Sequence, residues 1–547
     1  MTQDLAPHLT PGRAALGVLG VLVLYYWMQK FLISRRIAAL GSRAPMIRTC
    51  LPFAIDFVYG YIQTIQTGQD LDFWDTAMRT ARGASRFKTS PATVELNSGL
   101  SRNLFTADPE NIKAIISSQF ADYGKGKRFY EDWKELLGNS VFSTDGQLWA
   151  HSRQRLRPMF TKERITNLEI FETYAQKLIT LLHGSDLPNR VVDIVPLFFR
   201  YTLDTATHYL LGKAANSLED PGTRIVEAIA YIMARQEEFF KMDDFARLLS
   251  RTKFRQELKV IDNFLQPYID EVLSRSAEEL DPAYSKTDTF LDALARSTRD
   301  GRDIRDQLLG ILIAGRDTTA VTLSFALFEL SRNPDILAKV RSEIAAKFSV
   351  GPNSRKPTYN GLKDMKCLRA VLNETMRLYP VVPLNYRHAL RDTTLPRGGG
   401  PDGLSPIGVL GDTRIIFSIG LMMQREELYP PPGSDNYFDP KTWLPQRWWS
   451  GWQPKPWEFL PFHRGQRTCI GQEFAFVEMQ YTVIRILQVY KEIVAFPACG
   501  KEKVEDPTIR FEVTLRPACE FNCLFLKEGE ETRSDHIRIL AFDSLAG

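Results

Sequence analysis

The sequence predicts a mainly helical fold with small β-sheets, preceded by one membrane-spanning helix. Three observations lead to this prediction: an uncharged apolar run near the N-terminus, helical periodicity through the centre, and short alternating segments near the C-terminus. Hydrophobic residues make up 44% of the 547 residues and charged residues 24%, which excludes a disordered or collagen-like chain. The formal charge of +4 does not favour a nucleic-acid partner, and six cysteines without a paired framework argue against a secreted disulfide scaffold.

The first expected element is a membrane helix. Residues 14–28 read AALGVLGVLVLYYWM without a charge, and the apolar character continues past Lys30 to Ile33. About 20 apolar residues cross the hydrocarbon of a bilayer, with a lysine reaching the interface. The basic residues Lys30, Arg35 and Arg36 follow this run, which opposes a cleaved signal peptide and keeps the bulk of the chain in the cytosol. A second apolar stretch, 50–65, is interrupted by a proline and an aspartate and is expected to lie on the membrane surface.

The chain after this anchor reads as one domain. Residues 1–36 are expected to form the membrane anchor and stop-transfer region, and residues 37–547 the catalytic domain. No long linker, low-complexity tract or internal repeat interrupts the second part.

Helical periodicity within the domain predicts a long helix over 303–331, ended by Asn333-Pro334, and a second helix over 362–378. Short strands are expected in three stretches, 381–416, 511–513 and 521–526. The glycine-rich run 398–403 is expected to be a turn, because a phosphate-binding cradle needs a helix directly after it, and Pro401 and the residues that follow supply none.

One cysteine stands in a pattern that indicates chemistry. Residues 462–471 satisfy F-x-x-G-x-R-x-C-x-G, with the cysteine at Cys469. A lone cysteine is usually a small buried hydrophobe. Here Arg464 and Arg467, together with the start of a helix at residue 472, are expected to favour the thiolate. The glycines Gly465 and Gly471 permit a tight loop and close approach by a planar group.

This segment resembles the haem-thiolate loop of the cytochromes P450, and segments from about Phe120 to Phe476 resemble that family in the expected order. The resemblance implies a helix-rich triangular prism that holds haem b (iron protoporphyrin IX) between the long central helix and the cysteine loop. Cys469 would be the axial ligand of the iron. Arg467 would bind a haem propionate, Phe462 would pack beside the sulfur, and Gly465 and Gly471 would shape the loop.

Two further motifs support the haem site. Trp149 and Arg153 lie one helical turn apart and match the family's helix whose side chains donate to a propionate. Glu374 and Arg377 form E-x-x-R on one helix face, and with Arg447 they resemble the family's buried charge cluster. We interpret that cluster as structural.

The middle of the long helix carries a candidate catalytic pair. Asp317 and Thr318 lie in the segment AGRDTT, where a glycine, an acid and a threonine each cost helix stability. Such penalties on one turn suggest function. The segment resembles the family's acid–alcohol pair, which implies that Thr318 and Asp317 deliver protons during dioxygen activation. Arg316 is expected to point away from the haem.

The runs 122–160 and 394–403 resemble the fungal alkane- and fatty-acid-hydroxylating branch of the family. This implies a single-pass endoplasmic-reticulum monooxygenase that oxidises the terminal carbon of a long-chain fatty acid or alkane. Its electrons would come from NADPH through NADPH–cytochrome P450 reductase, with cytochrome b5 as a further candidate partner, because no flavin or nicotinamide motif is evident in the chain. The reductase would dock around Arg464 and Arg467.

Three alternatives remain open. The fold could serve a fungal tailoring oxidase that acts on a polyketide or terpenoid metabolite. It could also serve an isomerase or dehydratase that needs no external electrons, although the retention of Asp317 and Thr318 counts against this. The third alternative is a protein that binds haem or lipid without catalysis.

Overall fold

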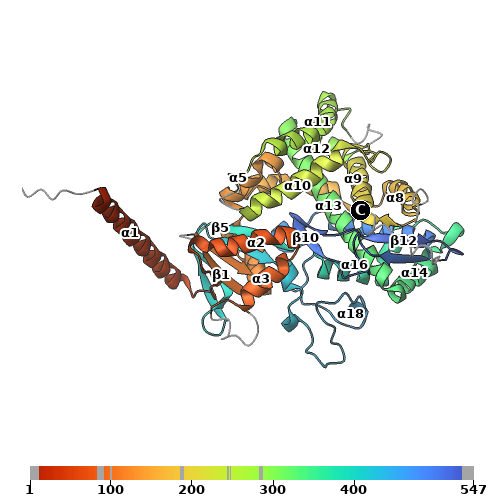
Figure 1. The fold of residues 1–547 in the computed structure, drawn as a ribbon. Coiled ribbons are helices and arrows are strands. Elements are labelled where there is room, and N and C mark those ends of the chain that lie inside the picture. The colour runs from red at the N-terminus through yellow and green to blue at the C-terminus, as the bar shows by residue number, and fades with distance from the viewer. Residues whose placement is uncertain are drawn as a thin grey trace, which may run out of the picture. The chain divides into compact units, whose positions relative to one another are not determined.

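The computed structural model describes residues 11–82, 91–98, 101–184, 190–242, 246, 248–281 and 288–531. The chain forms two compact units. Unit 1 comprises Met1–Phe57, Trp74–Gly124 and Tyr386–Phe417, and unit 2 comprises Val58–Phe73, Lys125–Asn385 and Ser418–Gly547. Figure 1 shows the helix-rich fold with its small sheets. The predicted fold class, mainly α with small β-sheets and an N-terminal apolar helix, is confirmed.

Unit 1 holds the N-terminal helix and most of the strands. Its five-stranded sheet has the order β1-β2-β8-β5-β3, in which β2 and β8 run parallel, and β6 and β7 form a separate antiparallel hairpin. The elements that lie wholly or mainly in unit 1 are α1 (Pro11–Leu40), η1 (Pro52–Ala54), α3 (Asp70–Arg79), β1 (Thr93–Ser98), β2 (Ser101–Thr106), α4 (Pro109–Lys113), η3 (Ala114–Ser118), η4 (Phe120–Asp122), β3 (Tyr123–Gly124), β5 (Leu384–Ala389), β6 (Thr393–Gly399), β7 (Ser405–Val409) and β8 (Arg414–Ser418).

Unit 2 holds most of the helices and two smaller sheets. The first part, to the long helix, comprises α2 (Ile55–Thr67), α5 (Gly126–Leu137), α6 (Gly146–Leu156), η5 (Arg157–Phe160), α7 (Lys162–Ile165), α8 (Glu169–Leu182), β4 (Val192–Asp193), α9 (Ile194–Leu211), α10 (Arg224–Met242), α11 (Thr252–Ser274), α12 (Phe290–Ser297) and α13 (Gly301–Arg332). The second part comprises α14 (Pro334–Phe348), η7 (Gly351–Asn353), α15 (Tyr359–Lys363), α16 (Lys366–Leu378), α17 (Ile419–Met422), η8 (Glu426–Leu428), α18 (Gln446–Trp449), η9 (Gly465–Arg467), α19 (Gln472–Val489), β9 (Glu492–Phe496), β10 (Ile509–Glu512), β11 (Thr514–Pro517) and β12 (Asn522–Leu526).

The long central helix α13 matches its prediction closely. The Asp300 side chain caps its start by accepting a hydrogen bond from the Arg302 amide, and Asn333 ends it before Pro334 begins α14. The predicted strands near 511–513 and 521–526 are also present, as β10, β11 and β12.

The helix predicted over 362–378 is wrong in extent, because two helices occupy this region. Met365 leaves the helical conformation between α15 and α16, with φ −78° and ψ 78°. The Glu343 carboxylate of α14 accepts hydrogen bonds from the Cys367 and Leu368 amides and so caps α16 from outside. The turn predicted over 398–403 is shorter than expected, because β6 continues to Gly399.

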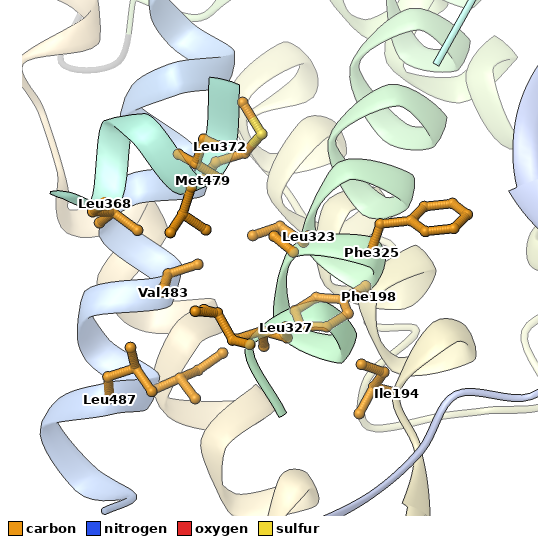
Figure 2. Close-up of a cluster of buried hydrophobic side chains, with 14 of the residues drawn as sticks. Ile194, Phe198, Leu323, Phe325, Leu327, Leu368, Leu372, Met479, Val483 and Leu487 are labelled. Carbon is orange, nitrogen blue, oxygen red and sulfur yellow. The ribbon is translucent and has the colours of Figure 1, made fainter. Parts of the chain in front are cut away.

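The core of unit 2 is a layer of apolar side chains between four helices (Figure 2). These side chains are Ile194 and Phe198 of α9, Leu323, Phe325 and Leu327 of α13, Leu368 and Leu372 of α16, and Met479, Val483 and Leu487 of α19. All ten are fully or almost fully buried. A close-packed core of this kind holds α13 and α19 in fixed positions, and both helices carry candidate site residues.

Two of the described helices are long and apolar enough to span a membrane. One is α13, which is buried inside the protein. The other covers Ala15–Leu40 of α1, whose side chains are mostly exposed up to Leu32. Farther along, Leu51, Phe53 and Ile55 are also exposed, in the stretch expected to lie on a membrane surface.

Candidate active site around Cys469

Cys469 lies in a tight loop between η9 and α19. The Cys469 amide donates to the Phe462 carbonyl over 3.0 Å, and the Thr468 amide donates to the Gly465 carbonyl over 3.2 Å. Gly465 has a φ of 73°, which favours glycine at this position. The Phe462 ring packs against Phe476 of α19 at 5.3 Å between centroids. The loop is thus fixed by its own backbone and by one aromatic contact.

The surroundings of the Cys469 sulfur differ from the expectation. Burial raises the pKa of its thiol, against a hydrogen bond from the Gly471 backbone and the positive charge of Arg153. The charge that favours the thiolate is therefore that of Arg153, in place of the expected Arg464 and Arg467. Arg464 is exposed, and Arg467 is paired with Asp145. Burial therefore favours the protonated thiol in the protein alone, and a bound metal ion would supply the positive charge that favours the thiolate. Cys469 is nonetheless an exposed residue, although burial of its thiol disfavours the charged form.

Three partly exposed residues interrupt the buried part of α13, and we call them the window. Every residue between Asp306 and Ser331 is buried except Ala314, Gly315 and Thr318. These three lie on one face of a single helical turn. A Cβ added at Gly315 would have only the Ala206 Cβ within 4 Å, at 3.9 Å, so packing does not require a glycine there. Open space therefore adjoins this turn.

The residues expected to hold propionates lie together. Arg153 donates to the Thr468 carbonyl of the cysteine loop over 2.8 Å. The guanidinium of Arg467 lies 4.6 Å from the Trp149 ring centroid, and that of Arg153 lies 5.9 Å from it. Arg467 also forms an ion pair with Asp145 at 2.5 Å. Burial and the charge of Arg153 lower the pKa of Arg467 to about 10, against the attraction of Asp145.

Glu374, Arg377 and Arg447 form a buried cluster. Both Glu374 oxygens accept from Arg377 over 2.8 Å, and Oε1 also accepts from Arg447 Nε over 2.9 Å. The Trp448 indole and the Leu444 amide complete the set of donors to this carboxylate. Burial opposes the charge on Glu374, but the two arginines outweigh it and lower its pKa. The cluster joins α16 to the segment 440–448, which precedes the cysteine loop.

The Asp317 side chain is fully buried, and its carboxylate bonds two arginines instead of adjoining open space. Its Oδ1 accepts from Arg316 over 2.8 Å, and its Oδ2 accepts from Arg516 of β11 over 3.0 Å. Both guanidiniums stack over the Phe199 ring, at 4.9 Å and 4.5 Å from its centroid. Arg316, also buried, therefore serves as the partner of Asp317. The Thr318 hydroxyl donates to the Ala314 carbonyl over 2.7 Å, and both residues belong to the half-buried window.

Sequence reasoning missed Glu478 of α19. Its side chain is 2% exposed, and burial raises its pKa to about 8, against a hydrogen bond with Thr319. An uncharged carboxylic acid therefore lies beside Thr319, the residue after Thr318. The only signal in the sequence is an acid within the apolar pattern FAFVEMQ.

The residues present fit the haem that the resemblance implies. The sulfur of a single cysteine can supply the axial ligand. The guanidiniums of Arg153 and Arg467 lie against the Trp149 indole, and Asp145 pairs with Arg467, so this group of residues carries excess positive charge and suits anionic propionates. Cys469 is an exposed residue, and open space adjoins the half-buried turn of α13 at Gly315, so a planar group could be accommodated at each place.

Comparison with known proteins agrees with this reading. The family model described as "Cytochrome P450" matches residues 86–517. A curated relative, "Cytochrome P450 monooxygenase pvhE" from Talaromyces variabilis, is 38% identical over 93% of this chain and 94% of its own length.

Two relatives from Candida species are similarly close. "Cytochrome P450 52A1" of Candida tropicalis is 39% identical over 70% of this chain and 72% of its own length. "Cytochrome P450 52A3-A" of Candida maltosa is 35% identical over 81% of this chain and 84% of its own length.

Proposed function

Because the chain belongs to the cytochrome P450 family of monooxygenases, we propose that it hydroxylates the terminal carbon of a long-chain fatty acid or alkane. The observation that supports a site for this reaction is the window on α13, where only Ala314, Gly315 and Thr318 interrupt a buried run of more than two turns on either side. The resemblance of 122–160 and 394–403 to the alkane- and fatty-acid-hydroxylating branch supports the substrate class.

Each site residue has a separate task in this proposal. Cys469 would hold the haem iron, Arg467, Arg153 and Trp149 would hold the propionates, and Phe462 would shield the sulfur. Gly465 and Gly471 would let the loop approach the ring. When bound, haem supplies the activation of dioxygen. Thr318 is one of the half-buried residues of the window, and its hydroxyl donates to the Ala314 carbonyl; it would release this bond to pass a proton received from Asp317 into the adjoining space.

Asp317 would relay that proton: a water would replace one of its two arginine partners and give a proton to the carboxylate, which would release it towards Thr318. Arg516 is the partner on another element and is half-buried, whereas Arg316 is enclosed beside Asp317 on α13. Glu374, Arg377 and Arg447 would have no chemical task and would hold the segment that leads to the cysteine loop.

NADPH would supply electrons through NADPH–cytochrome P450 reductase, with cytochrome b5 as a second candidate donor. Arg464 is exposed and available to an acidic partner, whereas Arg467 is paired with Asp145. Of the two arginines expected at the docking face, Arg464 is therefore the one we assign to it. The substrate would be hydrophobic and would reach the site from membrane lipid.

We place the protein in the endoplasmic reticulum membrane as a single-pass protein with a cytosolic body. The exposed apolar part of α1 and the basic residues after it support this orientation. Protease treatment of sealed microsomes is expected to digest the body and leave α1; protection of the body would contradict the orientation.

The test of the activity uses microsomes that contain the full-length chain and the reductase. We expect NADPH-dependent formation of terminal hydroxy products from fatty acids or alkanes, identified by mass spectrometry. Products only from polyketides or terpenoids would replace the substrate class by a tailoring reaction. Product formation without NADPH would indicate an isomerase or dehydratase. A spectral shift on ligand addition without any product would indicate a binding protein.

The proton-transfer role of Thr318 is tested in the same assay. Thr318→Ala is expected to lower the ratio of product formed to NADPH consumed, because the hydroxyl of this window residue is lost. Thr322→Ala is a matched control one turn along the helix, where the threonine is buried. Full coupling in Thr318→Ala would remove this residue from the mechanism.

A further inference from the structure

The last turn of α1 is embedded in unit 1, in contrast to the rest of that helix. Ile37 is 1% exposed, whereas Phe31 is 60% exposed and Leu32 is 47% exposed. Arg36 forms an ion pair with Asp392, with 2.9 Å between the guanidinium and the carboxylate. A hydrogen bond from the Gly411 backbone, followed by the one from Arg36, lowers the pKa of Asp392. The end of the helix is therefore held by both an apolar and a charged contact.

The surface that receives this turn is the β6–β7 hairpin, which contains the glycine-rich run noted in the sequence. Three glycines bring the two backbones into direct contact. A Cβ on Gly408 would lie 2.5 Å from the Ile37 carbonyl oxygen, one on Gly41 would lie 2.8 Å from the Pro406 oxygen, and one on Gly399 would lie 2.7 Å from Ser42 Cβ. None of these side-chain positions can be filled without moving backbone.

Backbone hydrogen bonds then fasten the segment that follows α1. The Ser42 amide donates to the Pro406 carbonyl over 2.8 Å, and the Gly408 amide donates to the Ser42 carbonyl over 3.0 Å. Beneath them, the fully buried carboxylate of Glu95 pairs with Arg102 at 2.8 Å, and Arg102 donates to the Gly408 carbonyl over 2.6 Å. The contact is thus continuous from the helix, through the hairpin, to the sheet.

No hinge lies between this contact and the membrane segment. Residues 21–40 contain neither glycine nor proline and form one uninterrupted stretch of α1. Sharp kinks in helices arise almost always at such residues or at local insertions. A helix segment that is fixed at one end and has no hinge keeps its direction, which here applies to residues 21–40.

We propose that the β6–β7 hairpin is a socket that fixes the direction of the membrane helix relative to the sheet of unit 1. The bilayer would then meet unit 1 at one set angle, rather than through a flexible tether. This proposal rests on the membrane location given in the proposed function. It assigns Gly408 to backbone contact with α1 and Gly399 to contact with the segment that follows α1.

The test measures one distance in the full-length protein in nanodiscs. Spin labels are attached to keto amino acids at two exposed positions, Leu24 in α1 and Leu390 in unit 1, so that the native cysteines remain. Double electron–electron resonance is expected to give one narrow distance peak. Gly408→Val is expected to lose that peak in favour of a broad distribution. Gly20→Val is the matched control, since its Cβ would have no protein atom within 4 Å.

A broad distance distribution in the protein without socket substitutions, or a narrow distance peak in Gly408→Val, would overturn the proposal. If Gly408→Val does not fold, Arg36→Asp provides a second perturbation, and Arg36→Asp/Asp392→Arg restores the opposite charges. The proposal then requires broadening in the single variant and recovery in the double variant. Insertion of each variant into the nanodiscs is measured separately. A failure of membrane insertion is thereby distinguished from a failure of the socket.

Discussion

The Arg516 guanidinium of β11 donates to the Asp317 carboxylate of α13 over 3.0 Å. This bond joins the antiparallel pair of strands β10 and β11 to the centre of the long helix. Arg316 bonds the other oxygen of the same carboxylate. The acid proposed to handle protons is thus also a structural anchor. Changes at Asp317 are expected to affect stability as well as chemistry.

Asp317→Asn is expected to lower the free energy of unfolding by about 3–5 kcal/mol, because it leaves the buried Arg316 without a counter-charge. Arg516→Met is expected to cost less, since Arg316 still pairs with Asp317. Denaturant titrations of the two variants and the parent protein measure the difference. Equal stability of Asp317→Asn and the parent would show that the ion pairs do not stabilise the fold.

Glu374 is the shared acceptor of two buried arginines, so its replacement leaves both without their anionic partner. Glu374→Gln is expected to destabilise the protein by about 3–5 kcal/mol and to reduce the yield of folded protein. Glu426→Gln, on the surface segment η8, is the control and should lie near the parent value. A thermal melt of Glu374→Gln that coincides with that of the control would contradict the structural role of the cluster.

Glu478 predicts a specific dependence of stability on pH. Its pKa of about 8 lies above the ordinary value of 4.5, so the folded protein retains a proton that the unfolded chain releases. The contribution of this group is complete below pH 4.5 and is lost as the pH rises towards 8. Between these values the free energy of unfolding is expected to fall by up to about 1.4 kcal/mol per pH unit relative to a variant without the acid.

Glu478→Gln removes this dependence because the amide does not titrate. Denaturant titrations of both proteins at several pH values between 5 and 8.5 are expected to give curves that diverge, with the variant gaining relative stability as the pH rises. Parallel curves would mean that Glu478 is ionised in the folded state or solvated in it.

The sequence carried local signals for much of this site. The loop around Cys469 shows its glycines and arginines within ten residues, and α13 shows its apolar stripe and its end. Trp149 and Arg153 could be paired because they lie one turn apart on one helix. In each case the information is contained in neighbouring residues.

What could not be predicted depends on contacts between distant segments. The break between α15 and α16 follows from the Glu343 carboxylate of another helix, which caps α16. The pairing of Asp317 with Arg516 joins residues 199 positions apart. The raised pKa of the Cys469 thiol also has a tertiary origin, because burial outweighs the Gly471 hydrogen bond and the charge of Arg153, which comes from another helix.

We propose that the Cys469 sulfur holds the iron of a haem, and every other role at the site depends on this bond. The absorption spectrum of the reduced full-length protein with carbon monoxide tests it. We expect the red-shifted band of a thiolate-ligated haem in the parent protein and in Cys499→Ser, which alters an exposed cysteine, and no such band in Cys469→Ser. A parent protein without pigment, or a Cys469→Ser variant that keeps the band, would show that Cys469 is not the ligand.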